Sequence, residues 1–202
     1  MAEFKNMDYI KESIGFVKGN LVPCVVAGIG SGIPVIGNSV VVNYLRKKKE
    51  GSVQIGDLFN FESLVPNFLA GLSKYGFMCC MVPGFLLVFS LPIMADKPGT
   101  DGLSAIKASF NFGKKNLIPM IIMTIMSGLV CTIPIFAMVI LSIIIGLISS
   151  TLAMIFGLVT LLVVMVIAAV GGPIVWGAIF NAYNGAKADV AAAAAEAGVT
   201  LA

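Results

Sequence analysis

The chain contains no histidine, the commonest general base, so the acidic residues are the first candidates for acid–base chemistry. Asp57 could pair with Glu62 or Asp96, since general acid–base catalysis uses positioned proton donors and acceptors. A helix-capping role explains Asp57 more simply, because a short polar side chain before an apolar run is typical of a helix start. Asp96 opens the tetrapeptide Asp-Lys-Pro-Gly, whose composition is typical of a turn. No nucleophile–base pair is visible, so we expect no catalytic residue and no enzymatic activity.

Cysteine chemistry and metal binding are also disfavoured. The four cysteines lie in apolar stretches, and no two have the Cys-x-x-Cys spacing of a metal or redox site: Cys24, Cys79, Cys80 and Cys131. We expect them to pack as small hydrophobic side chains. Without histidine the commonest metal ligand is missing, so we expect no metal site and no cofactor.

The composition predicts an integral membrane protein. Of the 202 residues, 58% are hydrophobic and 11% are charged, whereas soluble domains carry about 25% charged residues. The net charge is only +3, and no segment interleaves basic with aromatic residues, so nucleic acid is not an expected partner. Glu3, Asp8 and Glu12 interrupt the N-terminal segment, which therefore does not resemble a cleavable signal peptide. Membrane lipids are the expected partners.

The longest apolar block runs from residue 116 to residue 186 and contains 71 residues without a formal charge. A single spanning helix needs only about 20 residues, so this block must cross a bilayer more than once. Gly, Pro and hydroxyl residues predict breaks at Pro134, at 149–151 and at 171–173. We therefore expect three or four short passes here rather than two long tilted helices.

Two shorter apolar blocks, 21–45 and 75–95, contain Gly and Pro near their centres. Each predicts either a kinked spanning helix or a re-entrant hairpin. If both blocks turn back, every basic segment lies on one face of the membrane, as the positive-inside rule requires; if both cross, basic residues lie on both faces. Together the blocks predict an all-α integral membrane protein with about 4–6 hydrophobic helices, some broken or re-entrant.

Amphipathic helices are expected between the apolar blocks and at the membrane interface. Met7, Ile10, Ile14 and Val17 recur at helical spacing in the first of them. Residues 102–115 repeat this design, with Asp101 as the cap and Leu103, Ile106 and Phe110 as the apolar side. Such a helix lies either in the headgroup plane or against its own bundle. The basic residues expected at the membrane surface are Lys11, Lys18, Arg46, Lys47, Lys48, Lys49, Lys107, Lys114 and Lys115.

An internal two-fold repeat is predicted by a shift of 96 residues. Residues 10–23 then align without a gap with residues 106–119, and identical pairs include Lys11/Lys107, Ser13/Ser109 and Asn20/Asn116. Polar identities of this kind do not follow from general hydrophobicity. We expect a single membrane domain over 1–187, with repeat halves that start near 5 and 101, and an Ala-rich exposed tail over 188–202.

Small and polar residues inside the blocks suggest helix contacts. The pairs Gly28/Gly32 and Ala178/Ala182 have the four-residue spacing that lets two helices approach closely, in the same chain or in a neighbouring copy. Uncharged polar residues could line a passive pore, although they more often form hydrogen bonds between helices: Asn38, Asn43, Thr124, Ser127, Thr160, Asn181 and Asn184.

Several short motifs resemble those of a large family of uncharacterised prokaryotic integral membrane proteins. They are Gly-Asp-Leu-Phe at 56–59, Val-Pro-Gly-Phe at 82–85, Met-Ala-Asp at 94–96, Ala-Ile-Lys-Ala-Ser at 105–109, Pro173, and Ala-Tyr at 182–183. Related segments resemble the membrane regions that precede some glycerophosphodiester phosphodiesterase domains. The resemblance covers about residues 5–187, departs from the pattern in the third block, and implies a multi-spanning helical fold in a prokaryotic cell membrane or internal membrane. It transfers no catalytic residue.

These features predict a non-enzymatic, self-associating membrane protein. We expect it to scaffold or shape the bilayer, or to serve as an accessory subunit of a membrane complex, and to form a homo-oligomer or part of a larger assembly. A passive channel or a transporter of lipids or small solutes, built on the internal repeat, is the alternative. Coupled transport is disfavoured because no Asp, Glu, His, Arg or Lys is seen inside the membrane-embedded part of these blocks.

Overall fold

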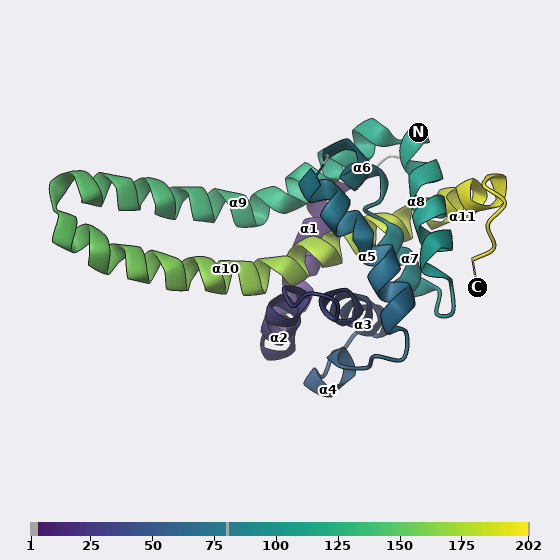
Figure 1. Ribbon diagram of the computed structural model, residues 1–202, viewed down its shortest axis with the longest axis horizontal. Helices are drawn as coiled ribbons and strands as arrows, with labels where there is room; N and C mark the ends of the chain where they lie inside the picture. Colours follow the sequence, from purple (N-terminus) through teal and green to yellow (C-terminus); the bar gives the residue numbers. More distant parts are fainter. Residues whose placement is uncertain (1–3, 80, 202) are drawn as a thin grey trace.

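The computed structural model describes the backbone of residues 4–79 and 81–201, and the side chains of those residues except 73–83 and 153. The described chain is helical, and its elements are α1 (Asn6–Gly19), α2 (Leu21–Ser31), α3 (Gly37–Glu50), α4 (Ile55–Leu58), α5 (Leu64–Cys79), α6 (Met81–Leu86), α7 (Ser90–Asp96), α8 (Gly102–Lys115), α9 (Leu117–Ile148), α10 (Ser150–Gly185) and α11 (Lys187–Glu196). Helices α9 and α10 project together as a hairpin from a compact group of the other helices, which we call the head (Figure 1).

The hairpin turns at a single residue. Ser149 has an extended backbone, and its side chain accepts a hydrogen bond from Leu152 N at 3.4 Å, which caps α10. At 1.5 Å per residue, the 32 residues of α9 and the 36 of α10 are about 48 Å and about 54 Å long. Both helices are long and apolar enough to cross a membrane. The prediction of three or four short passes is therefore wrong, because Pro134 and Pro173 lie inside continuous helices and only the break near Ser149 is present.

The two shorter apolar blocks are broken, as their Gly and Pro residues predict. The first is divided between α2 and α3, which are joined by a turn that includes Val35 in the left-handed region at φ 69°. Helix α2 also follows α1 with a bend of 110°, and together this pair has the length and composition of one broken span. The second block is divided among α5, α6 and α7. Over the described residues, the candidate spans thus number two, or three if the bent pair counts as one.

The core of the head lies where α3, α7 and α8 meet the C-terminal end of α10. Phe89 is fully buried and packs against other aromatic rings, among them Phe112 at 5.5 Å and Tyr183 at 5.8 Å between centroids. Leu45 and Met94 are also buried there. Because aromatic side chains bury a large apolar area, this cluster fixes the end of α10 inside the head.

Helix α8 has the predicted bounds, and most of its apolar side is exposed. Asp101 caps it by accepting hydrogen bonds from Leu103 N and Ser104 N at 3.1 and 3.3 Å. Its buried face consists mainly of small residues such as Ala105 and Ala108, which let neighbouring helices approach closely. Two of the three residues of the predicted apolar side, Leu103 and Phe110, are 53% and 40% exposed, so this side is not packed against the bundle.

The C-terminal segment forms a helix on the surface of the head. Helix α11 packs on α8, with Ala193 and Ala194 buried. Asn111 Nδ2 donates a hydrogen bond to Ala193 O at 2.7 Å, and Lys115 forms an ion pair with Glu196. These contacts tie the end of the chain to the head, although most residues of the segment predicted as an exposed tail, 188–202, are exposed where the structure describes them.

The junctions α1–α2 and α8–α9 share their local geometry. Asn20 and Asn116 separate the helices with nearly equal backbone angles, φ −131° and ψ 41° against φ −129° and ψ 34°. Each asparagine side chain donates to the carbonyl four residues earlier, Phe16 O at 3.1 Å and Phe112 O at 3.2 Å. The equivalent positions of the 96-residue shift therefore have the same hydrogen bonds at these two corners.

Candidate functional site: the arm and foot of the helical hairpin

The outer part of the hairpin, which we call the arm, comprises residues 128–148 of α9, Ser149, and residues 150–168 of α10. Its large apolar side chains are exposed, for example Leu147 at 84% and Leu158 at 63%. The arm contains no charged residue. Ser142 Oγ and Thr160 Oγ1, 2.9 Å apart, join the two helices near the middle. The two helical segments are about 31 Å and about 28 Å long, close to the roughly 30 Å hydrocarbon core of a bilayer.

The inner part of α10, residues 169–185, enters the head and packs against α1, α2 and α3; we call this region the foot. Gly28 of α2 lies directly against the backbone of Ala169, where an added Cβ would be 1.8 Å from the carbonyl oxygen. Pro173 lacks the N–H that would bond this carbonyl in a regular helix. Only glycine lets α2 approach so closely, and this contact marks the start of the foot.

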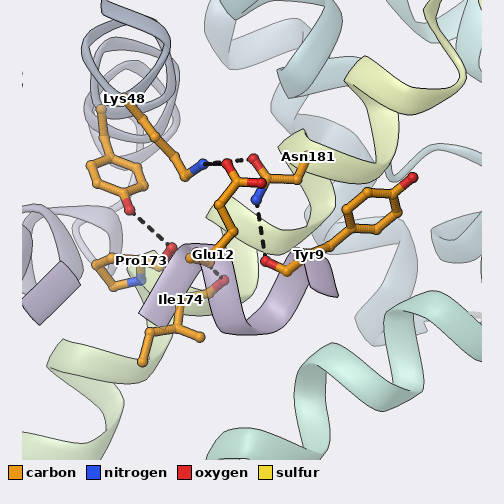
Figure 2. A network of polar contacts seen from close by, with 8 residues as sticks. Tyr9, Glu12, Lys48, Pro173, Ile174 and Asn181 are labelled. Atoms are coloured by element: carbon orange, nitrogen blue, oxygen red, sulfur yellow. Dashed lines mark hydrogen bonds and ion pairs between the residues drawn. The ribbon is translucent and has the colours of Figure 1, made fainter. Parts of the chain in front are cut away.

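Hydroxyl groups from two neighbouring helices bind α10 beside Pro173. Tyr44 OH donates to Pro173 O at 3.1 Å, and Ser13 Oγ donates to Ile174 O at 2.9 Å (Figure 2). Both side chains are buried. Because buried polar groups are stable only when hydrogen-bonded, these contacts fix the position of α10 relative to α1 and α3.

Lys48 is the buried basic residue of the foot. Its side chain is 6% exposed, and Nζ lies 2.6 Å from Asn181 Oδ1 and 3.4 Å from Glu12 Oε1 (Figure 2). Asn181 Nδ2 in turn donates to Tyr9 O at 3.1 Å. Burial lowers the pKa of Lys48, and the carboxylate of Glu12 opposes this effect in part. The side chain of Lys48, predicted to lie at the membrane surface, is buried and joins α3 to α1 and α10.

Asp96 forms a second charged cluster at the end of α10. Its side chain is fully buried and contacts Lys49 Nζ at 2.8 Å, Lys187 Nζ at 2.7 Å and Tyr183 OH at 3.0 Å. Burial alone would raise the pKa of the Asp96 carboxyl, but hydrogen bonds from these three side chains outweigh burial and lower the pKa. Asp96 therefore links α3, α7, α10 and α11, and Lys49 is an ion-pair partner rather than a free surface charge.

The remaining predicted surface cations divide into two groups. Arg46 is half-buried and donates to Met94 O at 3.1 Å, and Lys47 pairs with Glu50 at 2.8 Å, so both contribute to contacts within the head. The others lie on exposed positions of α1 and α8: Lys11, Lys18, Lys107, Lys114 and Lys115. Arg46 and Lys47 thus have partners within the protein, whereas the lysines of α1 and α8 are exposed, and their predicted place at a membrane surface stays a prediction.

The residues predicted to pack helices lie in different surroundings. Ala178 and Ala182 are buried in the foot, at 1% and 0% exposure, and Gly28 contacts α10 as described above. Gly32 is exposed, and a Cβ there would meet only Ile29 O of the adjacent turn at 3.3 Å. Gly32 therefore packs against no other helix in the described chain.

The polar residues considered as a pore lining mostly bond inside the protein. Asn43 Nδ2 donates to Leu58 O and Asn60 O, at 3.1 and 2.7 Å. Ser127 Oγ donates to Met123 O at 2.8 Å within α9. Asn181 bonds Lys48 and Tyr9 in the foot. These groups stabilise the contacts between and within helices.

The acids considered for catalysis also have structural partners. Asp57 accepts a hydrogen bond from Gln54 N at 3.1 Å and belongs to a capping box, so it occupies the third position of α4 rather than the N-cap position. Among the described residues, no group of three or more His, Cys, Asp or Glu side chains could hold a metal ion. Cys24 and Cys131 are free thiols in the structure, whereas the side chains of Cys79 and Cys80 lie outside the described residues.

The hydrogen bonds and ion pairs around the end of α10 could not be predicted from the sequence, and the reason is the same for each. Lys48, Tyr44 and Asp96 meet partners far away in the chain, and no local pattern indicates such meetings. Ser13 carried a weak signal, because it matches Ser109 under the 96-residue shift. Ser109 likewise donates to a carbonyl of another helix, Leu86 O at 2.9 Å.

Comparison with the known protein families, the curated proteins and the solved structures finds no match to this chain. The interpretation of the arm and the foot therefore rests on their own geometry and chemistry.

Proposed function

We propose that this chain is a non-enzymatic membrane protein whose arm is embedded in a lipid bilayer and whose head lies at one membrane face. The arm would associate with the arms of other copies, or with other subunits, to scaffold or shape the membrane. The observation that carries this proposal is the uncharged arm with exposed apolar side chains, whose length equals one hydrocarbon thickness. Exposed apolar patches of this extent are typical of membrane or protein interaction surfaces.

The distribution of charge supports an orientation. Both ends of the hairpin lie in the head, so the basic segments are all at the same end of the molecule (Figure 1). Cytoplasmic segments carry the excess of Lys and Arg, which favours a cytoplasmic head in the membrane of a prokaryotic cell. The turn at Ser149 would then lie at the opposite interface, where the hydroxyl groups of residues 149–151 meet water or lipid headgroups.

The shape of the molecule supports a role in membrane shaping. The head contains many helices, whereas the arm contains two, so the protein is much wider at one end (Figure 1). A wide head beside one leaflet and a narrow arm across the bilayer occupy unequal areas, which favours curvature.

Self-association is supported by two glycines of the arm that have open space beside them. Gly128 and Gly157 have no atom within 4 Å of the Cβ position. In a bilayer, small residues of this kind let a second helix approach closely. We also propose that the chain arose by internal duplication, because the 96-residue shift aligns the two helix corners with matching hydrogen bonds.

The embedding of the arm is tested by labelling at its turn. Ser150→Cys and Lys97→Cys would each be introduced after the four native cysteines are replaced by alanine, and intact proteoliposomes would be treated with a membrane-impermeant maleimide. The two sites should label from opposite sides of the membrane. Labelling of both from the same side would refute a spanning arm.

Self-association is tested with the full chain in nanodiscs and vesicles. Single-molecule photobleaching should give more than one copy per particle at low density, and electron microscopy should show altered vesicle curvature. A monomer that leaves vesicle shape unchanged would contradict the scaffolding role. Flux of ions, small solutes or lipids through the same vesicles would instead favour a passive conduit.

A further inference from the structure

We propose that one edge of α1, formed by Met7, Lys11, Ile14 and Lys18, binds the headgroups of anionic phospholipids in the leaflet next to the head. This edge, which we call the lysine edge, follows helical spacings of four, three and four residues. The inference rests on the proposed embedding of the arm and adds the lipid class that the protein would select.

The opposite edge of α1 points away from the turn of the hairpin. Tyr9 O accepts a hydrogen bond from Asn181, and an added Cβ at Gly185 would meet Tyr9 OH at 2.4 Å. Glu12 pairs with Lys48 on the same side. These partners lie near the C-terminal end of α10, far from Ser149.

The lysine edge must therefore face the arm. Ser13 bonds Ile174 O on the face between the two edges, so α1 crosses α10 at the foot (Figure 2). Asn6 Nδ2 also approaches Met126 Sδ of α9 at 3.5 Å. Helix α1 consequently lies across both helices of the hairpin, on the head side of the point where the arm begins.

The depth of this edge fits the headgroup region. Helix α2 meets α10 at Ala169, where the arm ends, and α1 meets it at Ile174, about 8 Å farther from the turn. The interfacial region on each side of a bilayer is about 5–8 Å thick. Leu21 and Val22 at the start of α2 are 52% and 64% exposed and carry the apolar surface toward the hydrocarbon.

The charges on the lysine edge are available to a ligand. Lys11 and Lys18 are exposed, and neither forms an ion pair with a described residue. Glu12, the nearest acid in sequence to Lys11, pairs with Lys48. Asp8 precedes Lys11 by three residues, one helical turn, but forms no ion pair with it in the described structure. Two unpaired ammonium groups beside exposed apolar residues match a phosphate group above acyl chains.

The test compares two double variants of the full chain. Lys11→Gln with Lys18→Gln changes the lysine edge, and Lys107→Gln with Lys114→Gln removes the same charge from the equivalent positions of α8. Helix α8 lies at the end of the head away from the arm (Figure 1). Purified protein would be titrated with phosphatidylglycerol or phosphatidylcholine, and bound lipid would be counted by native mass spectrometry.

We expect the α1 variant to bind phosphatidylglycerol about tenfold more weakly than the wild type, since each lysine near a membrane surface contributes measurably to anionic-lipid attraction. Its affinity for phosphatidylcholine should equal that of the wild type. The α8 variant should keep wild-type binding. Equal loss in both variants, or no loss in the α1 variant, would overturn the inference.

Two further readouts separate this inference from its alternatives. Excess inorganic phosphate should not displace the lipid, because competition would indicate a phosphate site rather than a bilayer surface. Labelling at position 150 should be unchanged in the α1 variant, because insertion depends on the arm. Failure of that labelling in the wild type would overturn the proposed embedding itself.

Discussion

The two parts of α10 have similar chemistry but opposite surroundings. Residues 150–168 and residues 169–185 are both free of charge. In the arm, Leu158 and Val166 are 63% and 62% exposed, whereas Ala178 and Phe180 of the foot are each 1% exposed. Apolar composition alone therefore does not specify whether a segment of this helix is buried in the head or exposed. That choice depends on small and polar residues that fit particular neighbours.

The largest effect is expected from a charge placed in the arm. Leu158→Arg should abolish stable membrane insertion, because an arginine at the centre of a spanning helix is unfavourable by about 3 kcal/mol on insertion scales. Val65→Arg in the head, at a position of similar exposure (66%), should leave insertion unchanged. Resistance to alkaline extraction of membranes measures both. Equal behaviour of the two variants would remove the distinction between arm and head.

A smaller effect is expected from a methyl group added to the foot. Gly28→Ala places a Cβ against the backbone of Ala169 and should destabilise the protein by about 2–3 kcal/mol. Gly157→Ala in the arm meets no atom within 4 Å and should raise the helix propensity by about 1 kcal/mol. Thermal unfolding in detergent compares the two. A neutral Gly28→Ala would show that α2 does not approach α10 closely.

The ion-pair cluster of Asp96 should make the stability of the head depend on pH. Because the pKa of Asp96 is lowered in the folded protein, its contribution is complete above the ordinary value of 3.8 and is lost as the pH falls through the folded pKa. Asp96→Asn should destabilise the protein at pH 7 by about 2 kcal/mol, through loss of charged hydrogen bonds. Lys49 and Lys187 are half-exposed and remain hydrated in this variant.

Thermal unfolding between pH 3 and pH 7 tests this prediction. The difference between the wild type and Asp96→Asn should shrink at acidic pH. A difference that stays constant over this range would exclude ionised Asp96 as the source of stability.

The smallest losses of stability are expected when single hydroxyl groups are removed from the foot and from the arm. Ser13→Ala removes a buried bond to Ile174 O and should cost about 1 kcal/mol. Ser142→Ala removes the contact with Thr160 and should cost about 0.6 kcal/mol, as is typical of hydrogen bonds between membrane helices. Unfolding in mixed micelles measures both, and a larger loss for Ser142→Ala would reverse the ranking.

Local features of the fold were predictable where the cause lies within one turn of helix. The bounds of α8 follow from the Asp101 cap and from the lysines near its end. The division of 21–45 follows from its central Gly and Pro residues. In each case the backbone conformation depends on neighbouring residues, so the sequence contains the necessary information.

The path of α10 and the charged clusters were not predictable in this way. Pro173 predicts a break by itself, yet the helix continues. Neighbouring helices pack around this position and donate hydrogen bonds to the carbonyl groups of Pro173 and Ile174. Asp96 resembles a turn residue, and its meeting with Lys49 and Lys187 depends on the assembled head. Long-range packing decides these positions, and a single sequence does not reveal which distant residues meet.

The single-residue joint at Ser149 has a consequence for the biogenesis of the protein. If the arm is embedded as proposed, two helices that reverse direction within one residue leave no hydrophilic loop to be carried through the lipid. Because residues 116–186 contain no Asp, Glu, Lys or Arg, insertion of this pair would move no charged side chain across the bilayer.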